Sequence, residues 1–251
     1  DGVITFENGA AYKTAPDGKV TVMRPEENAA FAAGIVALIL ALIGAFSVVR
    51  FAVDSVKGLT DKTEFTLETL AGIKTLSLQV ENGITKSVSV GMGRAEFSSN
   101  KVPVIWDGDE VVNQKLSLSS GDWNVTCVSM GNPHCVTFIQ DSPRTLNLES
   151  IGPEFENNAI FPERVNTEFI RVIDDKTLEM RVWERGSGET LACGTGACAS
   201  VAAAVKNGIC RAGEEITVKL LGGDLNITCS EDYEITMRGP AEIAFEGEVA
   251  L

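Results

Sequence analysis

The sequence has a single histidine, His134, among its 251 residues, and it has no Gly-x-Ser-x-Gly segment. A Ser-His-Asp hydrolase triad therefore has little support. The chain also lacks the Gly-x-x-x-x-Gly-Lys-Ser/Thr loop that cradles nucleotide phosphates. These absences argue against serine-hydrolase and P-loop nucleotide chemistry.

Basic residues are scarce: 21 Lys and Arg stand against 35 Asp and Glu, which gives a net charge of −14. Such a charge disfavours nucleic acid and anionic membrane surfaces, so we expect neither as a partner. A small zwitterionic substrate stays compatible with it, because local arginine side chains and backbone amides can hold one.

The six cysteines form no Cys-x-x-Cys pair and show no paired metal-ligand spacing, and no signal peptide opens the chain. Reduced thiols, a cytoplasmic location and no metal site are therefore expected. The abrupt start at Asp1 suggests that earlier residues are missing.

One long segment carries no charge: residues 28–49, NAAFAAGIVALILALIGAFSVV. By hydropathy alone it is a transmembrane candidate. The alternative is a helix buried on all sides in a globular core. We favour the buried helix, because no aromatic belt flanks the segment and most of the following chain has a soluble pattern.

Alternating segments predict strands through most of the remaining chain. We expect them at residues 64–70, 74–80, 87–90, 115–118, 123–129, 164–172, 177–183, 215–220, 223–229, 233–238 and 242–245, with a further strand after the turn at 130–136. A second apolar helix is predicted at 197–206, capped by Asn207-Gly208. The pattern favours an α+β fold of two similarly built domains, each a mixed, mostly antiparallel sheet around one helix. The domains would be residues 1–95, with 240–251 returning to them, and residues 96–239.

Residues 184–198 combine charge, glycine and cysteine, and Cys193 stands just before the second predicted helix. Free amides and the positive dipole end at a helix N-terminus lower the pKa of a thiol and attract anions. A carboxylate could therefore dock on the amides of Gly194, Thr195 and Gly196 beside an accessible, oxidisable sulfur. The same residues fit a Gly-x-Gly-x-x-Ala dinucleotide fingerprint, which we consider weak because a loop, not a strand, precedes it.

Three segments, residues 130–134 (MGNPH), 161–169 (FPERVNTEF) and 181–199 (RVWERGSGETLACGTGACA), resemble the diaminopimelate epimerase family. The resemblance extends over about residues 51 to 251. It implies two pseudo-symmetric domains with the active site in the cleft between them, and an isomerase that uses no pyridoxal phosphate, metal or nucleotide. Members interconvert LL- and meso-2,6-diaminopimelate with two cysteines, a step towards lysine and peptidoglycan, and are often homodimers.

The resemblance also assigns residues. Cys193 would exchange the α-proton on one face of the substrate carbon, with electrostatic help from His134 and Glu184. The substrate-binding positions would be Asn132, Asn166, Glu184, Arg185, Gly194, Thr195 and Gly196. The plainer interpretations are a turn histidine bonded to the backbone for His134 and an exposed ion pair for Glu184 and Arg185.

The first-domain cysteine of the family is missing. Its Cys-Gly-Asn-Gly segment should fall between about Val22 and Ser47, and no cysteine precedes Cys127. Either the chain is a diaminopimelate-binding relative that does not epimerise, or the sequence of residues 10–50 is unreliable. A relative acting on proline or hydroxyproline is disfavoured by Glu184-Arg185, which suit a second amino-acid head.

Overall fold

The fold was obtained as a computed structural model that describes residues 2–5, 11–14, 20–23, 62–69 and 72–241. The charge-free segment 28–49 and the strand predicted at 242–245 lie outside these residues. Within them, no helix is both long and apolar enough to cross a membrane.

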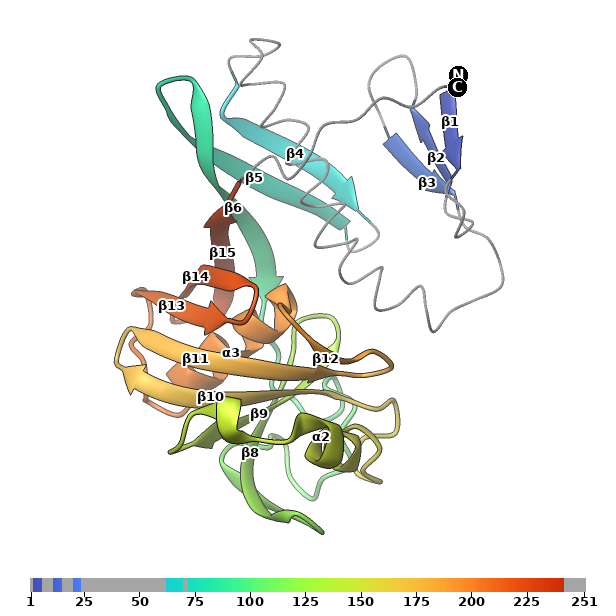
Figure 1. The fold of residues 1–251 in the computed structure, drawn as a ribbon, viewed down its shortest axis with the longest axis vertical. Helices are drawn as coiled ribbons and strands as arrows, with labels where there is room; N and C mark the ends of the chain where they lie inside the picture. The colour runs from blue at the N-terminus through green and yellow to red at the C-terminus, as the bar shows by residue number, and fades with distance from the viewer. Residues whose placement is uncertain (1, 6–10, 15–19, 24–61, 70–71, 242–251) are drawn as a thin grey trace.

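Strands dominate the described chain (Figure 1). A small antiparallel sheet has the order β1-β2-β3, and a twelve-stranded sheet has the order β4-β5-β6-β15-β14-β13-β11-β10-β9-β8-β7, with β12 paired to β11. The strands are β1 (Gly2–Thr5), β2 (Ala11–Thr14), β3 (Val20–Met23), β4 (Glu64–Thr69), β5 (Gly72–Glu81), β6 (Ile84–Arg94), β7 (Gln114–Leu118), β8 (Gly121–Ser129), β9 (Pro133–Ile139), β10 (Asn166–Asp174), β11 (Thr177–Glu184), β12 (Gly188–Thr190), β13 (Glu215–Leu220), β14 (Gly223–Cys229) and β15 (Glu234–Pro240).

The large sheet is mixed and mostly antiparallel, as predicted. Its parallel pairs are β9 with β10 and β11 with β13. The first of these sets Asn166 opposite His134. Since alternate residues of a strand share a face, Glu168 lies on the same face as both. This face receives the helix α3.

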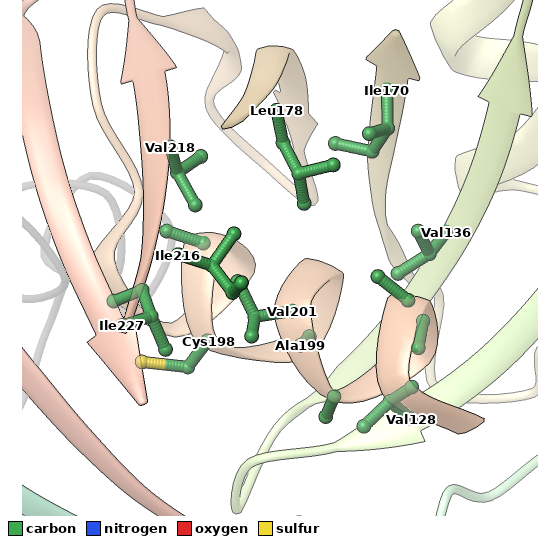
Figure 2. Packing of buried hydrophobic residues seen from close by; sticks show 14 of the residues in the cluster. Val128, Val136, Ile170, Leu178, Cys198, Ala199, Val201, Ile216, Val218 and Ile227 are labelled. Atoms are coloured by element: carbon green, nitrogen blue, oxygen red, sulfur yellow. The ribbon is translucent and has the colours of Figure 1, made fainter. Parts of the chain in front are cut away.

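The helix α3 (Gly194–Lys206) lies at the centre of the main core. Its alanines, Cys198 and Val201 pack against side chains from β8, β9, β10, β11, β13 and β14 (Figure 2). Small side chains suit a helix with strands close on several sides, because they let the backbones approach. The predicted C-terminal cap is confirmed: Asn207 is the cap residue, and Gly208 follows with φ +70°. The helix starts three residues earlier than the predicted start at Ala197, since the Gly-Thr-Gly segment at 194–196 forms its first turn.

The opposite face of the sheet packs against α2 (Leu148–Glu156), which the sequence did not predict. Its sequence, LESIGPEFE, contains a Gly-Pro pair that normally marks a turn. Gly152 is required there, because a Cβ on it would lie 2.3 Å from the Trp183 ring. A short 3₁₀ turn, η1 (Pro143–Thr145), precedes this helix.

Buried thiols make the fold sensitive to alkaline pH. All six cysteines are free and buried. Burial raises the pKa of Cys210 and Cys229 to about 11, from an ordinary value of 9.0, and also raises the pKa of Cys135, Cys193 and Cys198. As pH rises above 9, the unfolded chain loses these protons before the folded chain does, so the free energy of unfolding falls.

We expect a loss of about 1.4 kcal/mol per pH unit for each such thiol above pH 9, measured by denaturant unfolding at pH 8, 9 and 10. Between pH 7 and 8 these thiols should not change the free energy of unfolding, because they stay mostly protonated in both the folded and the unfolded chain. A Cys229→Ala variant has one titrating thiol fewer and should show a shallower slope. Equal slopes in the two proteins would contradict the assignment to buried thiols.

Candidate active site

Cys193 is the N-cap residue of α3, as the sequence predicted. Its backbone is extended (φ −131°, ψ 109°), and its Sγ accepts a hydrogen bond from the Gly196 amide at 3.3 Å. The sulfur thus takes the place of the serine or aspartate oxygen that usually satisfies the first amides of a helix. The β11–β12 hairpin delivers the chain to this position, since β12 ends at Thr190.

The expectation of an accessible, low-pKa thiol is wrong. Cys193 is only 6% exposed, and burial raises its pKa well above 9.0, helped by the nearby carboxylates of Glu184 and Glu168. The hydrogen bonds from Thr195 and Gly196 lower the pKa, but by less. Cys193 is therefore a thiol at neutral pH, the form that can donate a proton.

Glu184 ends β11 and lies beside Cys193. Its side chain is 8% exposed, and it accepts a hydrogen bond from the Thr190 hydroxyl. Burial raises the pKa of the Glu184 carboxyl, and Glu168 adds to the rise, whereas Thr190, His134 and Cys193 lower it. The interpretation of Glu184 as an exposed surface charge is therefore wrong.

His134, at the start of β9, is fully buried, and both of its ring nitrogens have side-chain partners. Nδ1 lies 2.6 Å from Oε1 of Glu168, and Nε2 lies 3.0 Å from Oδ1 of Asn132. The backbone-bonded turn histidine is therefore excluded. Glu168 lies within the motif at 161–169 but was not assigned a role from the sequence, and it is fully buried under the first turn of α3.

Asn132 connects the histidine to the cysteine. Its Nδ2 donates to Oγ1 of Thr195 at 3.3 Å, and that oxygen lies 3.6 Å from Sγ of Cys193. Residues 63 positions apart in the chain thereby join one hydrogen-bond chain. It runs from Glu168 through His134, Asn132 and Thr195 to Cys193.

Asn166 and Arg185 lie at the edge of this group. Asn166 donates to the Pro133 carbonyl at 3.1 Å and accepts from the Arg185 amide at 3.0 Å. The Arg185 guanidinium donates to the Glu163 carbonyl at 2.8 Å, so it is held by backbone and not paired with Glu184. Behind this loop, the buried carboxylate of Glu156 accepts from the Gly186 amide at 2.8 Å. Like Glu168, Glu156 was not singled out in the sequence.

Gly196 is required by its neighbours. A Cβ at this position would lie 2.6 Å from Oε1 of Glu168 and 3.2 Å from Sγ of Cys193. We expect Gly196→Ala to lower the free energy of unfolding by about 1–3 kcal/mol, because it forces the buried carboxylate aside. Chemical denaturation would measure this, with Gly208→Asn as the control, since nothing lies within 4 Å of a Cβ there and asparagine tolerates positive φ.

The arrangement can move protons. A thiol, a carboxyl of raised pKa and a histidine lie at a helix N-terminus whose amides attract a carboxylate. No group of three His, Cys, Asp or Glu side chains within the described ranges is placed to hold a metal ion. The dinucleotide reading fails on topology, because β12 has three residues and is antiparallel to β11.

Solved structures with the same fold are known. A hydroxyproline epimerase from Agrobacterium vitis aligns with a TM-score of 0.57 at 15% identity, over 77% of this chain and 63% of that chain. A probable proline racemase from Agrobacterium radiobacter K84 aligns with a TM-score of 0.61 at 15% identity, over 82% and 66%. These likenesses define the fold class: α+β, with few helices.

Sequence comparison identifies the family. The model of the family described as diaminopimelate epimerase matches residues 126–244. A diaminopimelate epimerase from Methanococcus maripaludis (strain C5) is 48% identical over 196 residues, which cover 78% of this chain and 70% of the relative. The chain belongs to the diaminopimelate epimerase family and is an isomerase.

Proposed function

We propose that this chain converts LL-2,6-diaminopimelate to meso-2,6-diaminopimelate by proton transfer at one α-carbon, with Cys193 as one of the two proton-transferring groups. The observation that carries the proposal is the Cys193 thiol at the N-cap of α3, beside Glu184 and within one hydrogen-bond chain with Thr195, Asn132 and His134. The names of its relatives supply the substrate.

Epimerisation needs one group to remove the α-proton and another to add a proton on the opposite face. When a base removes the proton, the electron pair left on carbon spreads into the α-carboxylate, which must be stabilised by preorganised donors. The amides of Gly194, Thr195 and Gly196 are suited to that task. The Cys193 thiol then gives its proton to the other face and becomes a thiolate.

Two cysteines perform these steps in the mechanism that the resemblance implies. This sequence has no cysteine before Cys127. Apart from Cys193, its cysteines are buried, Cys198, Cys210 and Cys229 in the core around α3 and Cys127 and Cys135 in the core on the opposite sheet face. We propose that the second proton-transferring group comes from residues 1–95, which with 240–251 would form the second of two pseudo-symmetric domains and the other wall of the cleft.

Different residues would bind the two amino-acid heads of diaminopimelate. The helix N-terminus would hold the reacting carboxylate, with Asn132 and Asn166 beside it. Arg185 and Glu184 would recognise the distant amino-acid head, whose carboxylate matches the planar guanidinium. Arg185 would exchange its bond to the Glu163 carbonyl for this carboxylate.

The test is α-proton exchange of diaminopimelate in deuterated water, with stereochemistry read on the same sample. Exchange with inversion supports a complete two-group site. Exchange of one isomer without inversion would mean that Cys193 is the only group that transfers protons, and it would overturn the epimerase assignment. Binding by calorimetry without any exchange would indicate a binding protein instead.

A further inference from the structure

Glu168 is a buried carboxylate that neither the family motifs nor the proposed reaction explains. It is the third residue of β10 and is fully buried, and its Oε1 is 2.6 Å from Nδ1 of His134. Its Oε2 is buried and has no hydrogen-bond partner among the described residues. A carboxylate in this setting costs free energy, since a leucine or glutamine would leave no bare charged oxygen. Its presence therefore calls for a role other than stability.

The atoms facing His134 determine where its protons lie. Nε2 faces the Asn132 carbonyl oxygen at 3.0 Å, an atom that can only accept. Nδ1 faces the Glu168 carboxylate, which also accepts when ionised. With an acceptor at each nitrogen, the ring is satisfied on both sides only as the doubly protonated imidazolium. Among the described residues, the other titratable groups near this pair are Glu184 on β11, Cys193 at the N-cap of α3 and Cys135 on β9, and none of them is a cation.

We propose that Glu168 is a positioning residue that holds His134 as the imidazolium and thereby fixes the donor direction of the chain that ends at Cys193. The charged ring donates to Oδ1 of Asn132, which turns the Asn132 amide so that Nδ2 donates to Oγ1 of Thr195. Because Oγ1 already accepts from Asn132, its own hydrogen is left for Sγ of Cys193, 3.6 Å away.

This direction matters to proton transfer. Once Cys193 has given up its proton, a hydroxyl hydrogen aimed at the sulfur stabilises the thiolate. Bonds from a charged donor are about twice as strong as neutral ones, so the imidazolium strengthens the first link of the chain. His134 also lowers the pKa of the Glu184 carboxyl. The inference rests on the proposed function only for this effect on Cys193.

The single histidine of the chain makes a direct test possible, because ¹⁵N NMR of the imidazole has one residue to report. At pH 8 we expect both ring nitrogens to be protonated in the wild-type chain, because each of them faces an acceptor. In Glu168→Gln, which keeps the shape but removes the charge, one nitrogen should lose its proton. Glu179→Gln, which removes a carboxylate that is bonded to Arg144 and Ser142 and makes no contact with His134 or Glu168, should leave the spectrum unchanged.

A bare ring nitrogen in the wild-type chain would place the shared proton on Glu168 and overturn the proposal, as would identical spectra for wild type and Glu168→Gln. In the exchange assay, Glu168→Gln should be about tenfold slower and Glu179→Gln unchanged. An unchanged rate in Glu168→Gln would also overturn the positioning role. If the wild-type chain exchanges no α-proton, the proposed function fails, whereas the histidine spectrum still decides this inference.

Discussion

Replacing Cys193 by serine should lower α-proton exchange of diaminopimelate by about 10²- to 10⁴-fold, the range in which a positioned acid or base contributes to proton transfer. Serine keeps the N-cap bond to the Gly196 amide, since a hydroxyl is a good cap. It does not replace the thiol, because a hydroxyl is far less acidic than even a buried thiol. The fold and the ligand cradle should therefore survive while the proton donor is lost.

Exchange in deuterated water and calorimetric binding of diaminopimelate, run on the same preparation, separate these effects. We expect binding to change little, because the amides of residues 194–196 stay in place. Cys210→Ser is the matched control, since Cys210 is also buried but follows the C-terminal end of α3. Full exchange activity in Cys193→Ser, or an equal loss in Cys210→Ser, would remove Cys193 from the reaction.

The position of Cys193 was predictable from the sequence, whereas its acidity was not. Nearby glycines and a run of alanines indicate a helix start just after Cys193, and the structure places that start at Gly194, three residues before the predicted one. The charges that govern the thiol come from β10 and β11, through Glu168 and Glu184. Sequence spacing cannot place these strands against the helix. Only the effect of the helix N-terminus, which lowers the pKa of the Cys193 thiol, could be predicted from the sequence.

The same limit explains which site residues were missed. The parallel pairing of β9 and β10 brings His134 and Glu168 together across 34 positions, and no local pattern indicates that register. Glu168 lies within a motif that was recognised, but a charged residue in a strand is normally solvent-exposed. The helix α2 was missed because a Gly-Pro pair opposes helix propensity, and packing against Trp183 outweighs it.

Strand prediction succeeded where one face of a strand is buried. In β11, alternate residues from Leu178 to Glu184 are buried, which gives a clear period of two. The last of these inward positions is occupied by Glu184. An acidic residue at a core-facing position of an otherwise regular strand is thus the one sequence signal that could have marked this carboxyl as buried.

Glu184→Gln should lower exchange by about 10²-fold and move the Cys193 limb of the pH–rate profile to lower pH. The direction follows from charge: the Glu184 carboxylate raises the pKa of the thiol, so removing it makes the thiol easier to ionise. The rate should fall nevertheless, because the buried carboxyl group of raised pKa next to the thiol is lost as a proton-transfer group. The profile of exchange rate against pH measures both effects.

Glu189→Gln is the appropriate comparison for this variant. Glu189 lies on the neighbouring strand β12 and pairs with Arg181, whose guanidinium also donates to the carbonyls of Pro143 and Leu146 and so stays anchored. Glu189→Gln removes one negative charge from the β11–β12 hairpin, as Glu184→Gln does, but it leaves the carboxyl group beside Cys193 in place. The exchange rate and its pH profile should therefore stay near those of the wild-type chain. A profile that shifts equally in both variants would mean that the hairpin's overall charge, and not the Glu184 contact, controls the thiol.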